Sequence, residues 1–539
     1  MNLEELFAIG AARAPAKPAL VVGRDGQAPR TLSFAELAAD AGRLAAGFSR
    51  WGLRKGDRVA FWLGNGPELV AAHLALLRIG AVMVPMNLAY RRREIAHILG
   101  DARPRLLLTE RDQLPLLAEV GVRDAGPSGG QGGATGEQGG AAQSSVEAVL
   151  VAEELDRWRA DPGLLRVPSP PPGGDDLALI LYTSGTTGRS KGAMISHNNL
   201  LATITALLAA WAWRSDDVLL LTLPLFHVHG LVVGLGCALA AGATVRLGRR
   251  FDAAAVADEL AAGGTTLFFG VPTLYVRLVE ELRRRAAAAP GSSARGIAGE
   301  ALSAADLCFG ALRLCCSGSA PLAPETFAAF RELTGHAILE RYGMTEAGMI
   351  LSNPYAGPRL PGQVGTPLPG VSVRITDETG QDVPPGGEGE LLVRGANVFS
   401  GYWQAPAATA AAFTHDKLGR RWFQSGDLAR QDPATGSVTL LGRRQELILS
   451  GGLNVYPREI EETLTSFPGV REAAVVGLPH PEWGEVPIAY LVTEGSVDEA
   501  ELIAFCRRQM AAFKVPRELH RLDALPRNAL GKVLKHLLR

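Results

Sequence analysis

The feature that most constrains the fold is a regular exchange between short apolar runs and longer Ala/Leu-rich stretches through roughly the first 440 residues. DRVAFWL (57–63), for example, is followed by ELVAAHLALLRIG (68–80) and then by AVMVPM (81–86). The first and third segments have the length of strands, and the second has that of a helix. Strands that alternate with helices in this way are typical of α/β folds with largely parallel sheets.

The pattern changes near residue 360, where short alternating strands such as VSVRIT (371–376) are separated by Gly/Pro turns. This change predicts a small β-rich subdomain. We therefore predict a large N-terminal α/β domain at residues 1–442, which includes that subdomain, and a small mobile α+β domain at residues 443–539. The Gly/Ser-rich residues 125–145 are predicted to form a disordered loop, and residues 285–305 a flexible or weakly helical insertion.

Charge and cysteine content exclude several classes of protein. The formal net charge of −1 gives no reason to expect a nucleic-acid partner. Five cysteines without a CxxC pattern argue against a disulfide framework or structural zinc, and they favour a cytoplasmic location. Residues 218–245 are uncharged and long enough to span a membrane, but Pro224, two histidines and several glycines predict a buried strand, turn and short helix instead.

A Gly/Ser/Thr-rich loop, YTSGTTGRSKG, follows the apolar run LALILY (177–182). Its backbone N–H groups, hydroxyls and lysine would suit a triphosphate. It is not a Walker A loop, because Gly188 lies three residues before Lys191 and Gly192 follows the lysine. Composition alone would equally allow a flexible loop with one solvated lysine.

YTSGTTGRSKG resembles the signature loop of the adenylate-forming superfamily, which contains acyl-CoA synthetases, adenylation domains and firefly-type luciferases. Later motifs in matching order extend this resemblance over nearly the whole chain. It implies an enzyme that uses ATP and Mg²⁺ to join a carboxylic acid to coenzyme A through an acyl-adenylate. The phosphate-binding residues implied by the resemblance are Thr183, Ser184, Gly185, Thr186, Thr187, Gly188 and Lys191.

Three further motifs match the nucleotide and metal site of this superfamily: SGSAP (317–321), ERYGMTE (340–346) and WFQSGD (422–427). The resemblance implies that Tyr342 faces the adenine, that Thr345 contacts the phosphates, and that Glu346 holds Mg²⁺ with a hard oxygen ligand. The other nucleotide contacts that it implies are Ser317, Gly318, Ser319, Arg341 and Gly343, with Asp427 and Arg443 at the ribose.

The motif PRNALGK (526–532) places Lys532 near the end of the chain. The resemblance implies that this lysine reaches the reacting carboxylate and the α-phosphate, where a cation offsets developing charge; the alternative is a disordered basic tail. Gly451 and Gly452 would give the coenzyme A arm room to pass after the small domain rotates. Gln445 departs from the usual hinge residue of the family, which is Asp or Lys.

The segments expected to bind the acid look most like those of malonyl-CoA synthetases, and they contain His227, Arg277 and Met344. Arg277 is expected in a helix that points into the acyl tunnel, where a second substrate carboxylate would neutralise it. The alternative for Arg277 is a surface pair with Glu280 or Glu281. We predict malonate or methylmalonate as the acid, with a medium-chain or aromatic acid as the alternative, and neither a carrier-protein domain nor stable membrane insertion.

Overall fold

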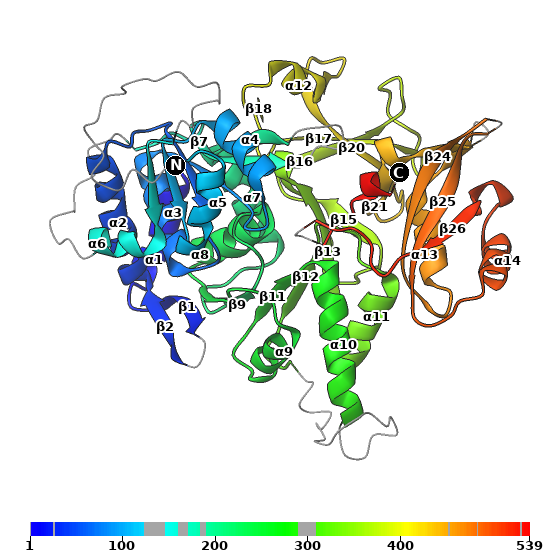
Figure 1. Cartoon of the computed structure of the whole chain (residues 1–539), viewed down its shortest axis with the longest axis horizontal. Helices are drawn as coiled ribbons and strands as arrows, with labels where there is room; N and C mark the ends of the chain where they lie inside the picture. Colours follow the sequence, from blue (N-terminus) through cyan, green and yellow to red (C-terminus); the bar gives the residue numbers. More distant parts are fainter. Residues whose placement is uncertain are drawn as a thin grey trace.

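The computed structural model describes residues 2–24, 27–122, 146–159, 171–183, 190–288, 309–450, 453–481, 483–528 and 531–538. Their strands form three sheets (Figure 1). The predicted fold class is confirmed, because packed α/β layers are followed by an antiparallel region and a separate mixed sheet. The loop predicted at 125–145 and most of the insertion predicted at 285–305 lie outside the described residues.

The first sheet has seven strands, of which the central ones run parallel. In spatial order these are β18 (Gly401–Tyr402), β8 (Lys191–Ser196), β7 (Leu177–Thr183), β4 (Val82–Pro85), β3 (Arg58–Trp62), β5 (Leu106–Thr109) and β6 (Ala148–Val151). Strand β18 comes from a distant part of the chain and pairs with the edge strand β8. It therefore joins the C-terminal side of the large domain to the strand that follows the phosphate loop.

The second sheet has fourteen strands and continues from the parallel region into the β-rich subdomain, which is therefore an extension of the sheet. Its order is β16 (Val371–Thr376), β17 (Glu388–Gly395), β20 (Arg421–Gln431), β21 (Val438–Arg443), β15 (Gln363–Pro367), β14 (Gly348–Ser352), β13 (Ile338–Met344), β12 (Leu314–Ser317), β11 (Leu267–Gly270), β9 (Val218–Leu221), β10 (Thr244–Leu247), β1 (Pro18–Arg24) and β2 (Gln27–Ser33), with β19 (Phe413–His415) paired to β20. Strands β9 to β13 are parallel, and those of the subdomain are antiparallel.

Helices fill the space between these two sheets and cover their outer faces. The shared layer contains α1 (Leu3–Arg13), α2 (Phe34–Trp51), α3 (Pro67–Ile79), α7 (His197–Ala210) and α8 (Cys237–Ala241), whose apolar residues form one core with both sheets. The outer face of the first sheet packs against α4 (Arg92–Ala102) and α5 (Leu114–Glu119), and that of the second against α9 (Ala253–Ala261), α10 (Pro272–Ala288) and α11 (Pro324–Thr334). Short helices α6 (Leu155–Arg159) and α12 (Pro406–Ala411) complete the set.

The third sheet belongs to the C-terminal part of the chain and has a core on each of its faces. It contains β23 (Leu453–Val455), β22 (Ile448–Ser450), β25 (Gly484–Thr493), β24 (Val470–His480) and β26 (Glu518–Arg521), with helices α13 (Pro457–Thr465) and α14 (Glu499–Gln509). Figure 1 shows this part in orange and red beside α10 and α11. The boundary predicted between residues 442 and 443 lies at the end of β21 and stays a prediction.

The uncharged segment 218–245 forms β9, a π-helical segment (His229–Gly236), α8 and β10. Gly230 packs so closely on the backbone of Pro224 that a Cβ atom would overlap it, which explains the break at this point. Among the described residues, no helix has the length and apolar character needed to cross a membrane.

Candidate active site

Tyr342, Asp427 and Arg443 form a buried polar cluster where β13 approaches the β20–β21 pair. The hydroxyl of Tyr342 donates to Asp427 Oδ2, and Arg443 Nε lies 2.9 Å from Asp427 Oδ1. Asp427 and Arg443 face each other in the antiparallel register of β20 and β21. Burial raises the pKa of Asp427, while the Arg443 charge and the Tyr342 hydrogen bond act in the opposite direction. The sheet thus holds a hydrogen-bonding carboxylate beside an aromatic ring.

The two ends of the predicted phosphate loop are fixed by the sheet. Thr183 ends β7, Lys191 begins β8, and these two residues are cross-strand partners. The residues between them that were predicted to bind phosphate, Ser184, Gly185, Thr186, Thr187 and Gly188, lie outside the described residues. The positions of Thr183 and Lys191 therefore show where the loop begins and where it ends.

Glu346 lies beside these loop ends, in the single turn Thr345–Ala347 that follows β13. Its Oε1 atom accepts hydrogen bonds from Tyr402 Oη at 3.0 Å and from Thr183 Oγ1 at 3.4 Å, and the residue is buried. The ammonium group of Lys191 lies 5.3 Å from the centre of the Tyr402 ring. Sequence reasoning missed Tyr402, which follows a Gly/Ser turn in a two-residue strand with no motif that marks it.

A single buried carboxylate fits the way proteins hold Mg²⁺ on a nucleotide, because the phosphates and water supply most of the ligands. Among the described residues, no three or more His, Cys, Asp or Glu side chains are grouped to hold a metal by themselves. Glu346 Oε2 accepts no hydrogen bond from the residues that the structure describes, and so this oxygen is available to a cation. The donor set therefore fits Mg²⁺ brought in with ATP.

Arg341 is buried next to this cluster with an incomplete set of partners. Its Nε and Nη2 atoms, and the hydroxyl of Ser317 on the neighbouring strand, lack hydrogen-bond partners among the described residues. Gly318 leaves room for the guanidinium, because a Cβ atom at that position would lie 2.5 Å from Arg341 Cζ. Burial lowers the pKa of Arg341, yet a guanidinium stays charged in proteins. The fold thus buries a positive charge that no carboxylate of the described chain neutralises.

Two histidines accompany this guanidinium. Burial, together with the Arg341 charge, lowers the pKa of His227 to about 4 and holds that of His229 well below its usual range. His229 Nδ1 lies 3.4 Å from Ser319 Oγ, its backbone N–H donates to His227 Nδ1 at 3.2 Å, and its Nε2 has no partner in the described chain. Both rings are neutral near pH 7, so Arg341 supplies the positive charge. The pattern HVH gave no reason to prefer His229 over His227.

Three more predicted residues lie along the same segment. Gly343 packs against the carbonyl of Gly348 where a side chain would not fit, and Met344 Sδ lies 3.7 Å from the Tyr342 hydroxyl. Thr345 is half-buried at the start of the turn that carries Glu346. The ERYGMTE motif thus brings its side chains to one place, while the contacts predicted for Gly343, Met344 and Thr345 stay predictions.

Lys532 comes from the C-terminal part of the chain and approaches the Asp427 cluster. Its turn is closed by hydrogen bonds from Lys532 N to Asn528 Oδ1 and from Asn528 N to Lys532 O, both 2.9 Å long. Gly531, at φ +77°, packs where a Cβ atom would lie 2.6 Å from Thr273 Oγ1 on α10. Partial burial lowers the pKa of Lys532, Arg443 adds to this effect, and Glu446 and Asp427 oppose it. Gly451 and Gly452 lie outside the described residues.

Arg277 lies on the outer face of α10, the face that also carries Thr273, and its predicted place in the acyl tunnel stays a prediction. Its side chain is exposed, and the guanidinium carbon lies 5.3 Å from the centre of the Phe251 ring. The physical reason is the apolar stripe of α10, formed by Tyr275, Leu278, Val279 and Leu282, which packs into the core and leaves Arg277 on the opposite face. The surface position matches the alternative, but the described residues show no ion pair of Arg277 with these carboxylates, since Glu280 pairs with Arg471 and Glu281 pairs with Arg284 and Arg285.

Comparison with known proteins establishes the class. Residues 7–403 match the family model described as AMP-binding enzyme, and residues 459–532 match the one described as AMP-binding enzyme C-terminal domain. Together with the fold and the site, these matches define an ATP-dependent adenylate-forming enzyme. The chain belongs to the AMP-binding enzyme family and is an AMP-forming acyl-CoA ligase.

Relatives that use different acids are equally similar. The sulfoacetate–CoA ligase of Cupriavidus necator is 35% identical over 538 residues, covering 99% of this chain and 96% of that one. A feruloyl-CoA synthase of Amycolatopsis sp is 35% identical (94% and 92% covered), and the mitochondrial malonate–CoA ligase of Homo sapiens is 36% identical (89% and 82%). The crystal structure of ATP-bound MatB from Rhodopseudomonas palustris superimposes with a TM-score of 0.84 at 37% identity, covering 100% of this chain and 98% of that one.

Proposed function

We propose that this ligase activates a short acid that carries a second negative charge, and that the acid is malonate. The observation that carries the proposal is the buried Arg341, which has two nitrogen atoms without partners in the described chain. This role replaces the nucleotide contact that the resemblance implied for Arg341. A buried charge without a counter-charge destabilises a protein by several kcal/mol. A carboxylate at the far end of the substrate would neutralise this one, and guanidinium can bind carboxylate through two parallel hydrogen bonds.

The neutral state of His227 and His229 supports this assignment. Neither ring adds positive charge at pH 7, and each still has a nitrogen that can donate or accept a hydrogen bond. The cluster of Arg341, His227 and His229 therefore suits a substrate with one anionic substituent, which the guanidinium and the polar ring nitrogens would surround. Gly318, whose missing side chain leaves room for the Arg341 guanidinium, lets this charge lie close to the Ser317–Ser319 segment.

The acids in the names of the relatives differ in whether they carry a second anionic group. Sulfoacetate and malonate are both short acids with a second anionic group, whereas ferulate is aromatic. The alternative function, ligation of an aromatic or medium-chain acid, would leave Arg341 buried without a counter-charge. Malonate, or methylmalonate with one more methyl group, is therefore the first choice, and sulfoacetate is the second candidate on the same physical grounds.

The proposed chemistry has two steps. A carboxylate oxygen of the acid attacks the α-phosphorus of ATP, which forms acyl-AMP and releases pyrophosphate. The thiol of coenzyme A then attacks the acyl carbon and releases AMP. No protein nucleophile is needed, so the protein contributes positioning and electrostatic stabilisation.

We assign the following roles to the chain. Lys532 offsets the charge that develops between the acid and the α-phosphate, and Asp427 with Arg443 holds the ribose hydroxyls. Glu346 would hold Mg²⁺, which supplies positive charge at the phosphates when bound. Tyr342 faces the adenine, and Gly451 with Gly452 gives passage to coenzyme A after rotation of residues 443–539. We also propose a cytoplasmic location, because the four described cysteines have free thiols.

The test is pyrophosphate release with malonate, methylmalonate, sulfoacetate, acetate, octanoate and benzoate, for the wild type and for Arg341→Met. Wild-type kcat/KM for malonate is expected to exceed that for acetate by about 100-fold or more, because acetate cannot neutralise Arg341. Arg341→Met should remove most of that preference. A wild-type enzyme that prefers octanoate or benzoate would show that the acid has been assigned wrongly.

A further inference from the structure

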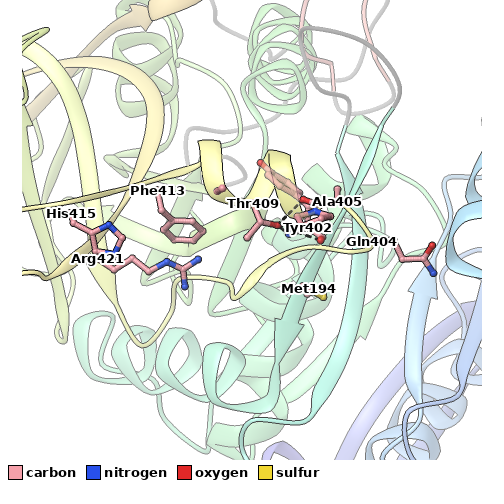
Figure 2. A pocket seen from close by; sticks show the side chains of 10 residues that line it. Met194, Tyr402, Gln404, Ala405, Thr409, Phe413, His415 and Arg421 are labelled. Carbon is pink, nitrogen blue, oxygen red and sulfur yellow. Dashed lines mark hydrogen bonds between the residues drawn. The ribbon is translucent and has the colours of Figure 1, made fainter.

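Tyr402 contacts two charged side chains of the active site, those of Glu346 and Lys191. It belongs to β18, which pairs with β8, so that Tyr402 is the cross-strand partner of Ala193. Figure 2 shows it beside Thr409 in the lining of a surface pocket of about 630 Å³, between Gln404 on one side and Phe413 and Arg421 on the other. The backbone N–H of Tyr402 donates to Thr409 Oγ1 at 2.9 Å, which fixes the strand that carries the ring.

The segment around Tyr402 holds Glu346 at two points. The Tyr402 hydroxyl donates to Glu346 Oε1 at 3.0 Å, and the backbone N–H of Phe399 donates to the Glu346 carbonyl at 2.8 Å. The rings of Phe399 and Tyr402 pack edge to face at 4.9 Å, so the two contacts belong to one rigid unit. Because a carboxylate oxygen accepts and the phenol donates, the contact orients Glu346 through its Oε1 atom.

The ring of the same residue carries the second contact. Lys191 Nζ lies 5.3 Å from the centre of the Tyr402 ring, within the range of a cation–π interaction. The Tyr402 ring thus holds the Lys191 ammonium group on the same residue whose hydroxyl donates to the Glu346 carboxylate.

We propose that Tyr402 is a positioning residue for the magnesium–nucleotide complex: its hydroxyl turns Glu346 so that Oε2 is left for the metal, and its ring holds Lys191 toward the phosphates. The proposal rests on the proposed role of Glu346 as the Mg²⁺ ligand. Partners that orient a metal ligand through a hydrogen bond commonly change metal affinity by about 10-fold or more when they are removed.

The test compares Tyr402→Phe, Tyr402→Leu and Thr409→Ser with the wild type. Calorimetric titration of ATP with and without Mg²⁺ measures binding directly, and pyrophosphate exchange gives the Mg²⁺ concentration for half-maximal rate. Tyr402→Phe, which keeps the ring, should raise that Mg²⁺ concentration by about 10-fold and leave ATP affinity without Mg²⁺ within about twofold. Tyr402→Leu should in addition weaken ATP binding without Mg²⁺, because Lys191 loses its support.

Thr409→Ser is the matched control, since it changes the same pocket wall but keeps the hydroxyl that accepts the Tyr402 N–H, and it leaves the contacts of Tyr402 with Glu346 and Lys191. Its Mg²⁺ dependence should equal that of the wild type. Tyr402→Phe with wild-type Mg²⁺ dependence, or with equal losses in both ATP titrations, would overturn the positioning role. If the wild type instead binds ATP equally well with and without Mg²⁺, the metal role of Glu346 is overturned, and the inference about Tyr402 is overturned with it.

Discussion

Glu280 on α10 forms an ion pair of 2.8 Å with Arg471 on β24, and this pair links the large domain to the C-terminal part of the chain. Both side chains are about half exposed, so the pair contributes at most about 1 kcal/mol. Any rotation of residues 443–539 relative to α10 must separate these two charges. The pair therefore belongs to one orientation of residues 443–539 relative to α10, and its effect on that orientation can be measured.

Reversing one of these charges should change the balance between the two half-reactions. Arg471→Glu is expected to slow acyl-adenylate formation by up to about fivefold, which corresponds to about 1 kcal/mol, and to spare thioester formation from supplied acyl-AMP. The double variant Glu280→Arg/Arg471→Glu should restore the first rate. Equal rates for the single variant and the wild type would mean that the pair does not influence the orientation.

Loss of the Lys532 amine should affect one half-reaction only. Lys532→Ala is expected to reduce adenylate formation by about 100-fold or more, because the charge that develops at the α-phosphate loses its cation. Single-turnover measurements with acid and ATP, and separately with acyl-AMP and coenzyme A, would distinguish the steps. Comparable losses in both would contradict the role assigned to this lysine.

The turn that carries Lys532 depends on Gly531. Gly531→Ala should slow adenylate formation, because its φ of +77° disfavours a side chain and the new Cβ would meet Thr273. Gly495→Ala is a matched control with φ +73° and open space around its Cβ, so it carries the backbone strain without the contact. The two variants should have similar melting temperatures, and only Gly531→Ala should be slow. A similar slowing in both would assign the effect to strain alone.

Arg277 and Arg341 can be separated by substitution. Arg277→Ala, at an exposed position over Phe251, should lower malonate kcat/KM less than Arg341→Met does. Arg341→Met should also raise the melting temperature without substrate, because an apolar side chain replaces a buried charge that lacks a counter-charge. A larger malonate defect in Arg277→Ala would return the substrate charge to α10, as the sequence had suggested.

Glu340 should make stability depend on pH. Burial is the largest influence and raises its pKa from 4.5 to about 7, although Gly362 N–H and Arg458 of α13 act against this. Because the folded carboxyl has the higher pKa, it binds its proton more tightly than the unfolded chain does. Its contribution to stability is complete below pH 4.5 and is lost as pH rises through about 7.

Glu340→Gln should therefore flatten the curve of unfolding free energy against pH between about 4.5 and 7. Denaturant unfolding of the wild type and the variant at several pH values would measure the difference between the curves. Parallel curves over this interval would mean that Glu340 has an ordinary pKa in the folded state.

The sequence predicted the fold class correctly because strand periodicity and glycine-rich turns are local signals, and the roles of the ERYGMTE residues stay predictions. It could not predict that β18 crosses to β8, which is a pairing between distant segments, and so Tyr402 went unnoticed. The orientation of Arg277 could not be predicted for a similar reason. Which side of α10 faces the core depends on packing with β11 and α11, and spacing along the helix does not reveal what lies opposite each face.

The helical layer shared by the first two sheets has a consequence for how the chain loses its structure. Apolar residues of α2, α3, α7 and α8 touch both sheets, so neither sheet can separate without exposing the interior of the other. The third sheet has interiors of its own. Heating should therefore melt the chain as two cooperative units of very unequal size, with the boundary between them near the end of β21.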